Sequence, residues 1–321
     1  MTGTFDREPT STSIPVFVIN GFLESGKTQF MKFTMQQEYF QDDRPTLLVL
    51  CEEGEEEYDE KLLKRTNTHL VVIEDQKEMT VERLHELELV YDPGRVLIEW
   101  NGIWNQDELE IPENWFVNQV VTLFDTSTMD LYLKNMKSLM GPMLRHSELV
   151  LCNRADDIPM DTLGEYHFQL RTMASNAEIV FEGREGEIRG DFSIELPYDL
   201  DADVIKIEPE DFGIFYMDSM ERSDKYNGKS VEFAGQVVKP RNIPKNSLVV
   251  GRRAMTCCEA DMQFLGFLCY YPGADSFHNK DWVKVKGKIK IENVAVYRGE
   301  GAVIEVTEVL RTGPIQEIVT F

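Results

Sequence analysis

The stretch Gly21-Phe22-Leu23-Glu24-Ser25-Gly26-Lys27-Thr28 matches the phosphate-binding loop pattern G-x-x-x-x-G-K-[ST] at every fixed position. Residues 14–20 before it form a short apolar run typical of a buried parallel strand, and residues 29–40 after it place apolar side chains on one helix face. In that setting the loop N–H groups and the helix N-terminus face phosphates, Lys27 reaches the outer phosphates and the Thr28 hydroxyl binds Mg²⁺. The sequence therefore predicts a nucleotide site here.

Downstream of the loop, short apolar segments alternate with amphipathic ones. Strands are predicted at 46–51, 70–73, 95–100, 118–124, 149–153 and 178–181, and helices at 61–65, 80–90, 127–140 and 162–173. This alternation predicts an α/β fold, a P-loop NTPase parallel sheet with helices on both faces.

The pattern changes in the last third of the chain. Residues 182–221 carry 13 acidic against 3 basic residues and are predicted to contain a linker. Beyond Asn227, five segments with a period of two (231–238, 248–256, 262–271, 281–291, 302–310) predict a small, mostly-β barrel, comparable to the oligonucleotide/oligosaccharide-binding (OB) type. The expected organisation is a disordered lead at 1–13, a nucleotide-binding domain at 14–190, an acidic linker at 191–221 and a β-rich domain at 222–321.

Composition narrows the cellular setting and the partners. The formal charge of −24 argues against affinity of the whole molecule for nucleic acid or an anionic membrane. No apolar run approaches the ~18 residues of a membrane helix, and residues 1–13 lack the apolar core of a secretory signal. Five cysteines in 321 residues favour a reducing cytoplasm over a disulfide framework. Residues 222–290 nevertheless carry a local charge of +7. This excess is explained either by a chance uneven distribution of charge on solvated faces or by a surface that binds an acidic partner.

Two later motifs specify the nucleotide. Glu99 ends an apolar strand, where a carboxylate would meet Mg²⁺, although such a residue is often only the first solvated position. Asn153-Arg154-Ala155-Asp156 resembles the N/T-K-x-D element of GTPases, in which the Asp accepts two hydrogen bonds from guanine. Adenine offers no such pair of donors, so GTP is predicted over ATP.

These residues carry a resemblance to the CobW/HypB/UreG-type P-loop GTPases, and most closely to the CobW-like metallochaperones. Glu99-Trp100-Asn101-Gly102 matches the Glu-x-x-Gly element of that family, and residues 51–59 keep Glu52, Gly54, Glu55 and Asp59 of its N-E-F-G-E-x-x-x-D segment. The resemblance implies slow GTP hydrolysis coupled to metal handling. The Cys-x-Cys-Cys metal motif of the family is missing, since residues 61–75 contain no cysteine, and no histidine-rich tail is present.

The expected roles follow from the motifs and the resemblance. Lys27 neutralises phosphate charge, Thr28 and Glu99 bind Mg²⁺, and Glu55 is a candidate to position water by analogy only. The residues expected to contact GTP are Gly21, Glu24, Ser25, Gly26, Lys27, Thr28, Gln29, Gly102, Asn153 and Asp156.

The C-terminal part resembles a domain of YcgQ-like bacterial proteins. The resemblance rests mainly on the pattern R-x-x-x-x-C-C-x-A-D, which residues 252–261 match. Cys257, Cys258 and Asp261 are candidate Zn²⁺ ligands. Because adjacent residues of a strand face opposite ways, the alternative is one core cysteine and one half-exposed thiol.

Three functions stay open at this level. The first is a cytoplasmic GTPase that delivers a metal, most readily zinc, to a client metalloprotein. This hypothesis predicts a bound ion that is lost when Cys257 and Cys258 are replaced. A GTP-dependent scaffold predicts no metal but a change in domain contacts with nucleotide. A nucleic-acid-binding barrel, disfavoured by the overall charge, would use the alternating Lys284, Lys286, Lys288 and Lys290.

Overall fold

The computed structural model describes residues 3–257, 262–297, 299–315 and 317–321. The chain divides into two compact units, Met1–Ser193 and Ile194–Phe321. Each unit has hydrophobic clusters of its own, and each is described by itself.

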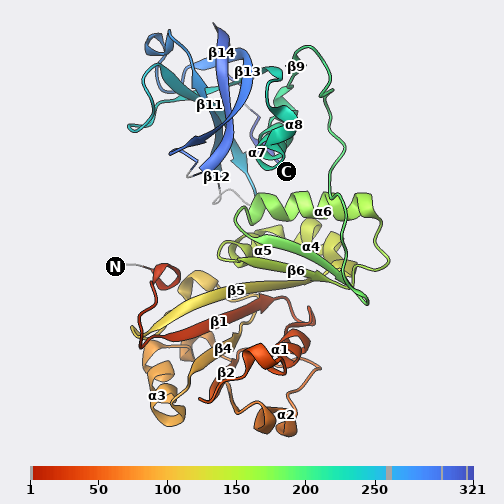
Figure 1. Cartoon of the computed structure of the whole chain (residues 1–321), viewed down its shortest axis with the longest axis vertical. Helices are drawn as coiled ribbons and strands as arrows, with labels where there is room; N and C mark the ends of the chain where they lie inside the picture. The colour runs from red at the N-terminus through yellow and green to blue at the C-terminus, as the bar shows by residue number, and fades with distance from the viewer. Residues whose placement is uncertain (1–2, 258–261, 298, 316) are drawn as a thin grey trace. The chain divides into compact units, whose positions relative to one another are not determined.

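The first unit is built on a sheet with the strand order β3-β2-β4-β1-β5-β6-β7-β8 (Figure 1). All neighbouring strands are parallel except β7 and β8, which form an antiparallel hairpin. The strands are β1 (Ile14–Gly21), β2 (Thr46–Leu50), β3 (Thr68–Val72), β4 (Arg95–Glu99), β5 (Trp115–Asp125), β6 (Leu149–Asn153), β7 (Glu178–Gly183) and β8 (Gly186–Glu187). Residues 14–21, 46–50 and 95–99 are almost wholly buried, as continuous apolar strands covered on both faces should be.

Helices cover both faces of this sheet, because alternate residues of each strand point to opposite sides. Along β5, Val120 and Phe124 face helices α3 to α6, whereas Val121 and Leu123 face α1 and α2. The helices are α1 (Lys27–Met35), α2 (Glu60–Arg65), α3 (Val81–Tyr91), α4 (Met129–Asn135), α5 (Lys137–Leu144) and α6 (Met160–Met173). The predicted parallel sheet with helices on both faces is therefore confirmed.

One predicted helix is divided in two. Residues 127–140 were expected to form a continuous helix, but Met136 leaves the helical conformation with φ −128° and ψ 17° between α4 and α5. Helix α5 then runs on to Leu144 and includes Pro142. The spacing of the apolar residues correctly predicted helix in this region. The break at Met136 was not predictable, because it does not change that spacing.

The second unit is a barrel closed by five strands: β10 (Ser230–Val238), β11 (Ser247–Met255), β12 (Met262–Tyr270), β13 (Trp282–Val294) and β14 (Gly299–Arg311). The ring runs β10-β11-β12-β14-β13 and returns to β10, with only the β12–β14 pair parallel. Two short strands, β9 (Ile205–Lys206) and β15 (Val319–Thr320), extend the edges. The five strands expected from the period of two are all present, and the OB-type comparison stays a prediction.

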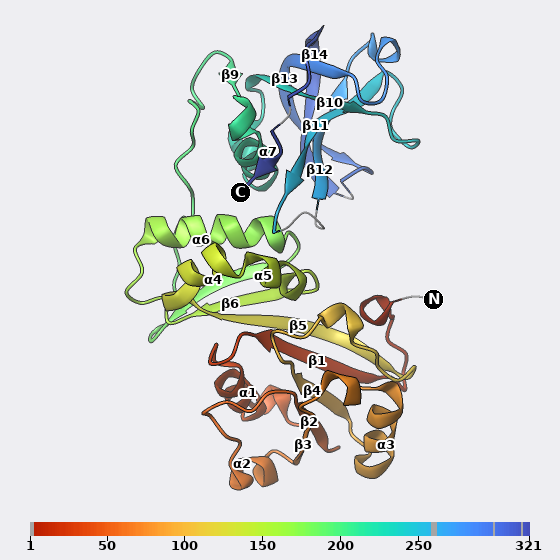
Figure 2. The same cartoon turned by 180° about the vertical axis from the view of Figure 1, so that it is seen from behind.

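The acidic stretch 191–221 is more ordered than its composition predicted. It contains β9 and the helix α7 (Phe212–Glu221), which is followed by α8 (Ser223–Tyr226). Phe212 and Phe215 are 1% and 0% exposed and pack in the barrel core with Phe233 and Phe267. Figure 2 shows α7 beside the strands of the barrel. The predicted linker is thus wrong for residues 205–221, because most of the acidic residues in the counted stretch precede α7, whereas the helix itself is mainly apolar and aromatic.

Helices that could cross a membrane were sought in the described residues. None of these helices is both long enough and apolar enough to do so.

Candidate functional site

The predicted site residues gather where parallel strands end. Gly21, Glu99, Asp125 and Asn153 are the last residues of β1, β4, β5 and β6, and Glu52 follows soon after β2. Since parallel strands point the same way, their carboxyl ends lie at one edge of the sheet, where ligands of open α/β sheets bind. Positions up to 132 residues apart in the sequence are brought together by this topology alone.

The loop backbone depends on three glycines. Gly21 and Gly26 have φ of +141° and +95°, values that L side chains rarely adopt. Gly102 lies against the loop, since a Cβ placed on it would come 2.3 Å from the carbonyl oxygen of Gly21. The Glu99-x-x-Gly102 element therefore contacts the first residue of the loop through backbone atoms.

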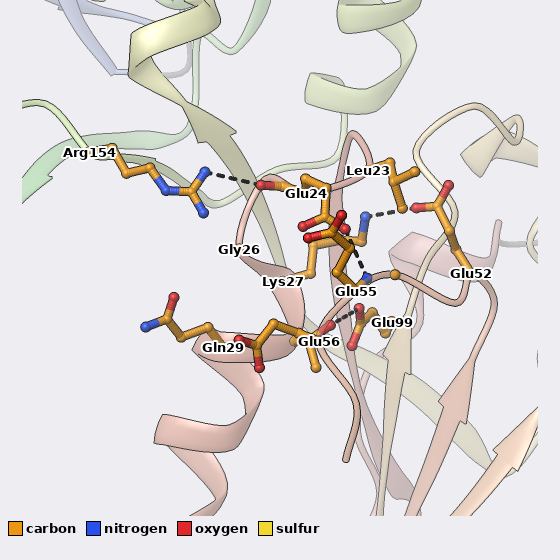
Figure 3. Close-up of a pocket in the computed structure, with 12 residues that line it drawn as sticks. Leu23, Glu24, Gly26, Lys27, Gln29, Glu52, Glu55, Glu56, Glu99 and Arg154 are labelled. Atoms are coloured by element: carbon orange, nitrogen blue, oxygen red, sulfur yellow. Dashed lines mark hydrogen bonds and ion pairs between the residues drawn. The ribbon is translucent and has the colours of Figure 1, made fainter.

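Lys27 is the buried cation of the site, only 4% exposed. Its Nζ donates to the carbonyl oxygens of Gly21 (2.8 Å) and Phe22 (3.0 Å), and it forms an ion pair with Oε2 of Glu52 at 3.0 Å (Figure 3). All three donor directions of the ammonium are engaged. An incoming phosphate would have to replace the Glu52 carboxylate.

Next to Lys27 lies a pair with the chemistry of a Mg²⁺ site. The Thr28 hydroxyl donates to Oε1 of Glu99 at 2.7 Å, and the Tyr58 hydroxyl donates to Oε2 of the same carboxylate. Burial raises the pKa of Glu99, an effect opposed by the hydrogen bonds from Tyr58 and Thr28 and by the charge of Lys27. Burial and the adjacent Glu99 also raise the pKa of Tyr58, which keeps its phenol protonated as a donor.

Residues 52–59, here called the acidic segment, contact the loop and its helix at several further points. The Glu24 carboxylate accepts a hydrogen bond from the backbone N–H of Glu55 at 3.1 Å, and Lys32 pairs with Glu56 at 2.7 Å. Figure 3 shows the segment beside Lys27 and Glu99. Between segment and loop lies a cavity of about 280 Å³, lined by five glutamates against Lys27 and Arg154. A polyphosphate would enter this cavity favourably only together with cations.

The motif of residues 153–156 lies on the other side of the loop. Asn153 Nδ2 donates to the Ser25 carbonyl at 2.7 Å, and Arg154 donates to the Glu24 carbonyl at 3.1 Å and pairs with Asp125 at 2.5 Å. Arg154 has φ +55°, in the left-handed region that a non-glycine residue rarely adopts.

Asp156 lies in a second cavity, of about 850 Å³, which also includes Phe30, Phe33 and Gly183. Its Oδ1 accepts the backbone N–H of Arg184 at 2.8 Å. A Cβ on Gly183 would come 2.6 Å from that oxygen, so glycine allows the β7–β8 hairpin to approach the carboxylate. Each oxygen of a carboxylate can accept more than one hydrogen bond, so Asp156 can still accept hydrogen bonds from a nucleotide base.

Two buried polar atoms without partners indicate whether the site suits a nucleotide. Within the described part of the chain, the Ser25 hydroxyl and Oδ1 of Asn153 are buried without a hydrogen-bond partner. Buried polar groups are normally paired, so unpaired ones in a binding loop fit a ligand that supplies the partner. With Thr28 already 2.7 Å from Glu99, the donor set fits a nucleotide with Mg²⁺.

The remaining predicted residues are placed as follows. Gln29 lines both cavities, and Glu55 lines the smaller one with its backbone tied to Glu24. Cys257, half-buried, belongs to the second unit, while Cys258 and Asp261 lie outside the described residues. Among the residues described, no group of three or more His, Cys, Asp or Glu side chains is arranged to hold a metal ion.

Some contacts were not anticipated from the sequence. Asp125 was not singled out, although it ends β5 as Glu99 ends β4, and that position is a usable signal. Burial opposes the lowering of the pKa of Asp125, but hydrogen bonds from Ser127 and Arg154 outweigh it. The contact between Tyr58 and Glu99 has no signal in the sequence, because it depends on how the acidic segment folds back.

Comparison with known proteins agrees with the division into two units. The family model of the CobW/HypB/UreG nucleotide-binding domain matches residues 15–181, and that of the DUF1980 C-terminal domain matches residues 188–318. UPF0703 protein YcgQ of Bacillus subtilis (strain 168) is 29% identical over 84 residues, which are 26% of this chain. The match spans 30% of the length of that relative.

Two similar solved structures are HypB proteins, the first of which is described as a hydrogenase maturation factor. HypB from Archaeoglobus fulgidus is 18% identical, covering 55% of this chain and 83% of its own, with a TM-score of 0.37. HypB from Helicobacter pylori, solved in complex with nickel, is 12% identical, covering 54% and 80%, with a TM-score of 0.35.

Proposed function

This chain belongs to the CobW/HypB/UreG nucleotide-binding family, and we propose that it is a slow GTPase acting as a nucleotide switch in metal delivery or metallocentre assembly. The observation that carries the switch is the set of contacts between the acidic segment and the phosphate loop. These contacts occupy Lys27 and Glu99, the two groups that a nucleotide and its metal would need.

The chemistry assigned to each residue follows from its position. Lys27 and the backbone N–H groups of residues 24–28 would hold phosphate oxygens, and Thr28 with Glu99 would hold Mg²⁺. Bound Mg²⁺ neutralises charge on the phosphates. Asp156 would accept the paired donors of guanine, with Asn153 keeping the motif against the loop through its 2.7 Å bond to Ser25. In the described residues no arginine points an unpaired guanidinium into the smaller cavity, which favours slow turnover.

The switch would work by exchange of partners. When phosphate takes Lys27, Glu52 loses its ion pair, and when Glu99 takes Mg²⁺, Tyr58 loses its acceptor. Two contacts of the acidic segment then disappear together. The acidic segment then becomes free to adopt a second conformation, and a client protein would recognise that conformation.

Hydrogen exchange tests this switch. With GTP and Mg²⁺, amides 52–59 are expected to change in protection by at least tenfold relative to the protein alone, and the Lys27→Ala variant should show no change. Unaltered protection of these amides in the wild-type protein at saturating GTP would contradict the proposal.

We propose zinc as the metal, with Cys257, Cys258 and Asp261 as its ligands in the second unit. Elemental analysis of the purified protein should find about one zinc per chain, lost in the Cys257→Ser/Cys258→Ser double variant and retained in Cys269→Ser, whose thiol is buried in the barrel core. Finding no metal, with the nucleotide-dependent exchange intact, would instead favour a regulatory scaffold without metal cargo.

A further inference from the structure

A cavity of about 320 Å³ on the barrel lies apart from the residues discussed so far. Its lining includes Ile315 and Ile318 near the C-terminus and the polar side chains of Gln236, Arg252, Arg253, Lys280, Trp282 and Glu317. All of these residues belong to the second unit. The volume suits a small ligand.

The strand pairing explains why these side chains converge. Gln236 is opposite Trp282 on β13 and opposite Gly251 on β11, and Arg253 lies two residues beyond Gly251 on the same side. The residues that alternate with them, Val237, Val283 and Ala254, are buried in the barrel core. A cation, an amide and an aromatic ring therefore share one outward patch.

The two exposed cations of this cavity, Arg253 and Lys280, lack carboxylate partners in the described part of the chain. Arg253 and Lys280 form no ion pair within the residues that the structure describes. Arg252 is 2% exposed, and its guanidinium donates to the backbone carbonyls of Pro209 and Glu317, while its Nε has no partner in the described ranges. Glu317 is the one acidic residue among those lining the cavity. The lining thus has an excess of positive charge in a chain of net charge −24.

We propose that this cavity, referred to as the barrel cavity, binds a small phosphate monoester that carries a flat organic group. Arginine and lysine together match the charge and the hydrogen-bonding geometry of a phosphate dianion. Trp282 offers an aromatic face to a planar group, and Gln236 can donate and accept beside it. This proposal does not depend on GTP binding by the first unit.

The charges around the cavity favour a small molecule over a nucleic acid. Two lysines of β13 that would extend a basic track are already neutralised, Lys284 by Glu232 at 2.6 Å and Lys290 by Glu305. Non-specific nucleic-acid binding needs a continuous track of cations along the phosphate backbone. On β13, the ion pairs of Lys284 and Lys290 interrupt such a track on either side of Lys286 and Lys288.

Calorimetric titration of the full chain with phenyl phosphate tests the proposal. Wild-type protein should bind with a Kd below about 1 mM, a weak affinity in reach for a ligand of this size. The Arg253→Ala/Lys280→Ala variant should bind at least tenfold more weakly. The matched Arg241→Ala/Lys245→Ala variant, which removes two exposed cations of the same barrel outside the cavity, should bind within twofold of wild type. The Lys27→Ala variant should also bind within twofold, which separates this site from the phosphate loop.

A second comparison examines the aromatic contact. Trp282→Ala should abolish the preference for phenyl phosphate over inorganic phosphate while the fold, followed by circular dichroism, is kept. No binding at 10 mM phenyl phosphate, or equal weakening by both double variants, would overturn the proposal. Tighter binding of single-stranded DNA than of phenyl phosphate would overturn it as well, in favour of a nucleic-acid surface.

Discussion

At the scale of single residues, Lys27 combines a buried charge with an internal counter-ion. Its ammonium is held by two loop carbonyls and by Glu52 at 3.0 Å. Removing Lys27 therefore takes away the strongest phosphate donor and leaves Glu52 facing the cavity unpaired. Both effects oppose nucleotide binding.

We expect Lys27→Ala to weaken GTP binding by about 100-fold, since charge-assisted hydrogen bonds contribute roughly 1.5–3 kcal/mol each and the exposed Glu52 adds repulsion. Lys64→Ala, which removes an exposed helix lysine remote from the cavity, should leave the Kd unchanged. Equilibrium titration with a fluorescent GTP analogue measures both. A Lys27→Ala protein that binds as well as wild type would show that the loop is not the phosphate site.

Asp156 is expected to set the choice of base. Asp156→Asn should reduce the preference for GTP over ATP at least tenfold, because the variant can no longer accept two hydrogen bonds from guanine. Asp161→Asn, an exposed carboxylate in the first turn of α6, is the matched control. Competition by ATP as effective as by GTP in the wild-type protein would refute the assignment.

At the scale of elements, the acidic segment would compete with a nucleotide for Lys27. Glu52→Gln keeps the shape of the side chain but removes its charge, so GTP affinity should rise by about three- to tenfold, the range of a partly exposed ion pair. Glu53→Gln, an exposed neighbour in the same segment, should change little. A lower GTP affinity in Glu52→Gln would mean that Glu52 assists binding.

Helix α7 is expected to stabilise the barrel although it follows an acidic stretch of the chain. Phe215 is completely buried among Tyr226, Phe233 and Phe267, so Phe215→Ala should lower the free energy of unfolding of the second unit by about 3–5 kcal/mol. Glu208→Ala, exposed just before this helix, should have almost no effect. Urea denaturation measures both variants, and a loss below 1 kcal/mol for Phe215→Ala would return this stretch to the status of a linker.

The elements show where sequence reasoning succeeds and where it stops. The strands around the loop were predictable because buried parallel strands are continuously apolar, as residues 46–50 are. The same holds for the barrel, where Val231, Phe233 and Val237 alternate with polar residues. The role of Phe215 was hidden because the charge count covered a window in which most acidic residues precede the helix that carries Phe215.

The site was predictable to the extent that its residues have fixed places in a motif. Gly21, Lys27 and Thr28 follow from one pattern, Glu99 follows from a strand end, and Asn153 follows from the resemblance to the N/T-K-x-D element. The pairing of Tyr58 with Glu99 and of Arg154 with Asp125 was not predictable, because each joins a loop to a strand end through tertiary packing alone.

At the scale of the whole molecule, the two units have separate hydrophobic cores. Saturation with GTP and Mg²⁺ at 100 times the Kd should stabilise the first unit by about 2.7 kcal/mol and leave the second unit unaffected. Scanning calorimetry should then show one transition moving and one staying in place. Equal shifts of both transitions would indicate that the units unfold together.

The ion pair between Lys27 and Glu52 also imposes a threshold on ligand charge. A single phosphate ion offers Lys27 about the same attraction as the carboxylate that it must displace, whereas a triphosphate engages the loop, Thr28 and Glu99 at once. If the loop is the proposed phosphate site, the built-in carboxylate would favour nucleotides over small anions there. The total charge of the ligand would then separate orthophosphate from GTP before any base is read.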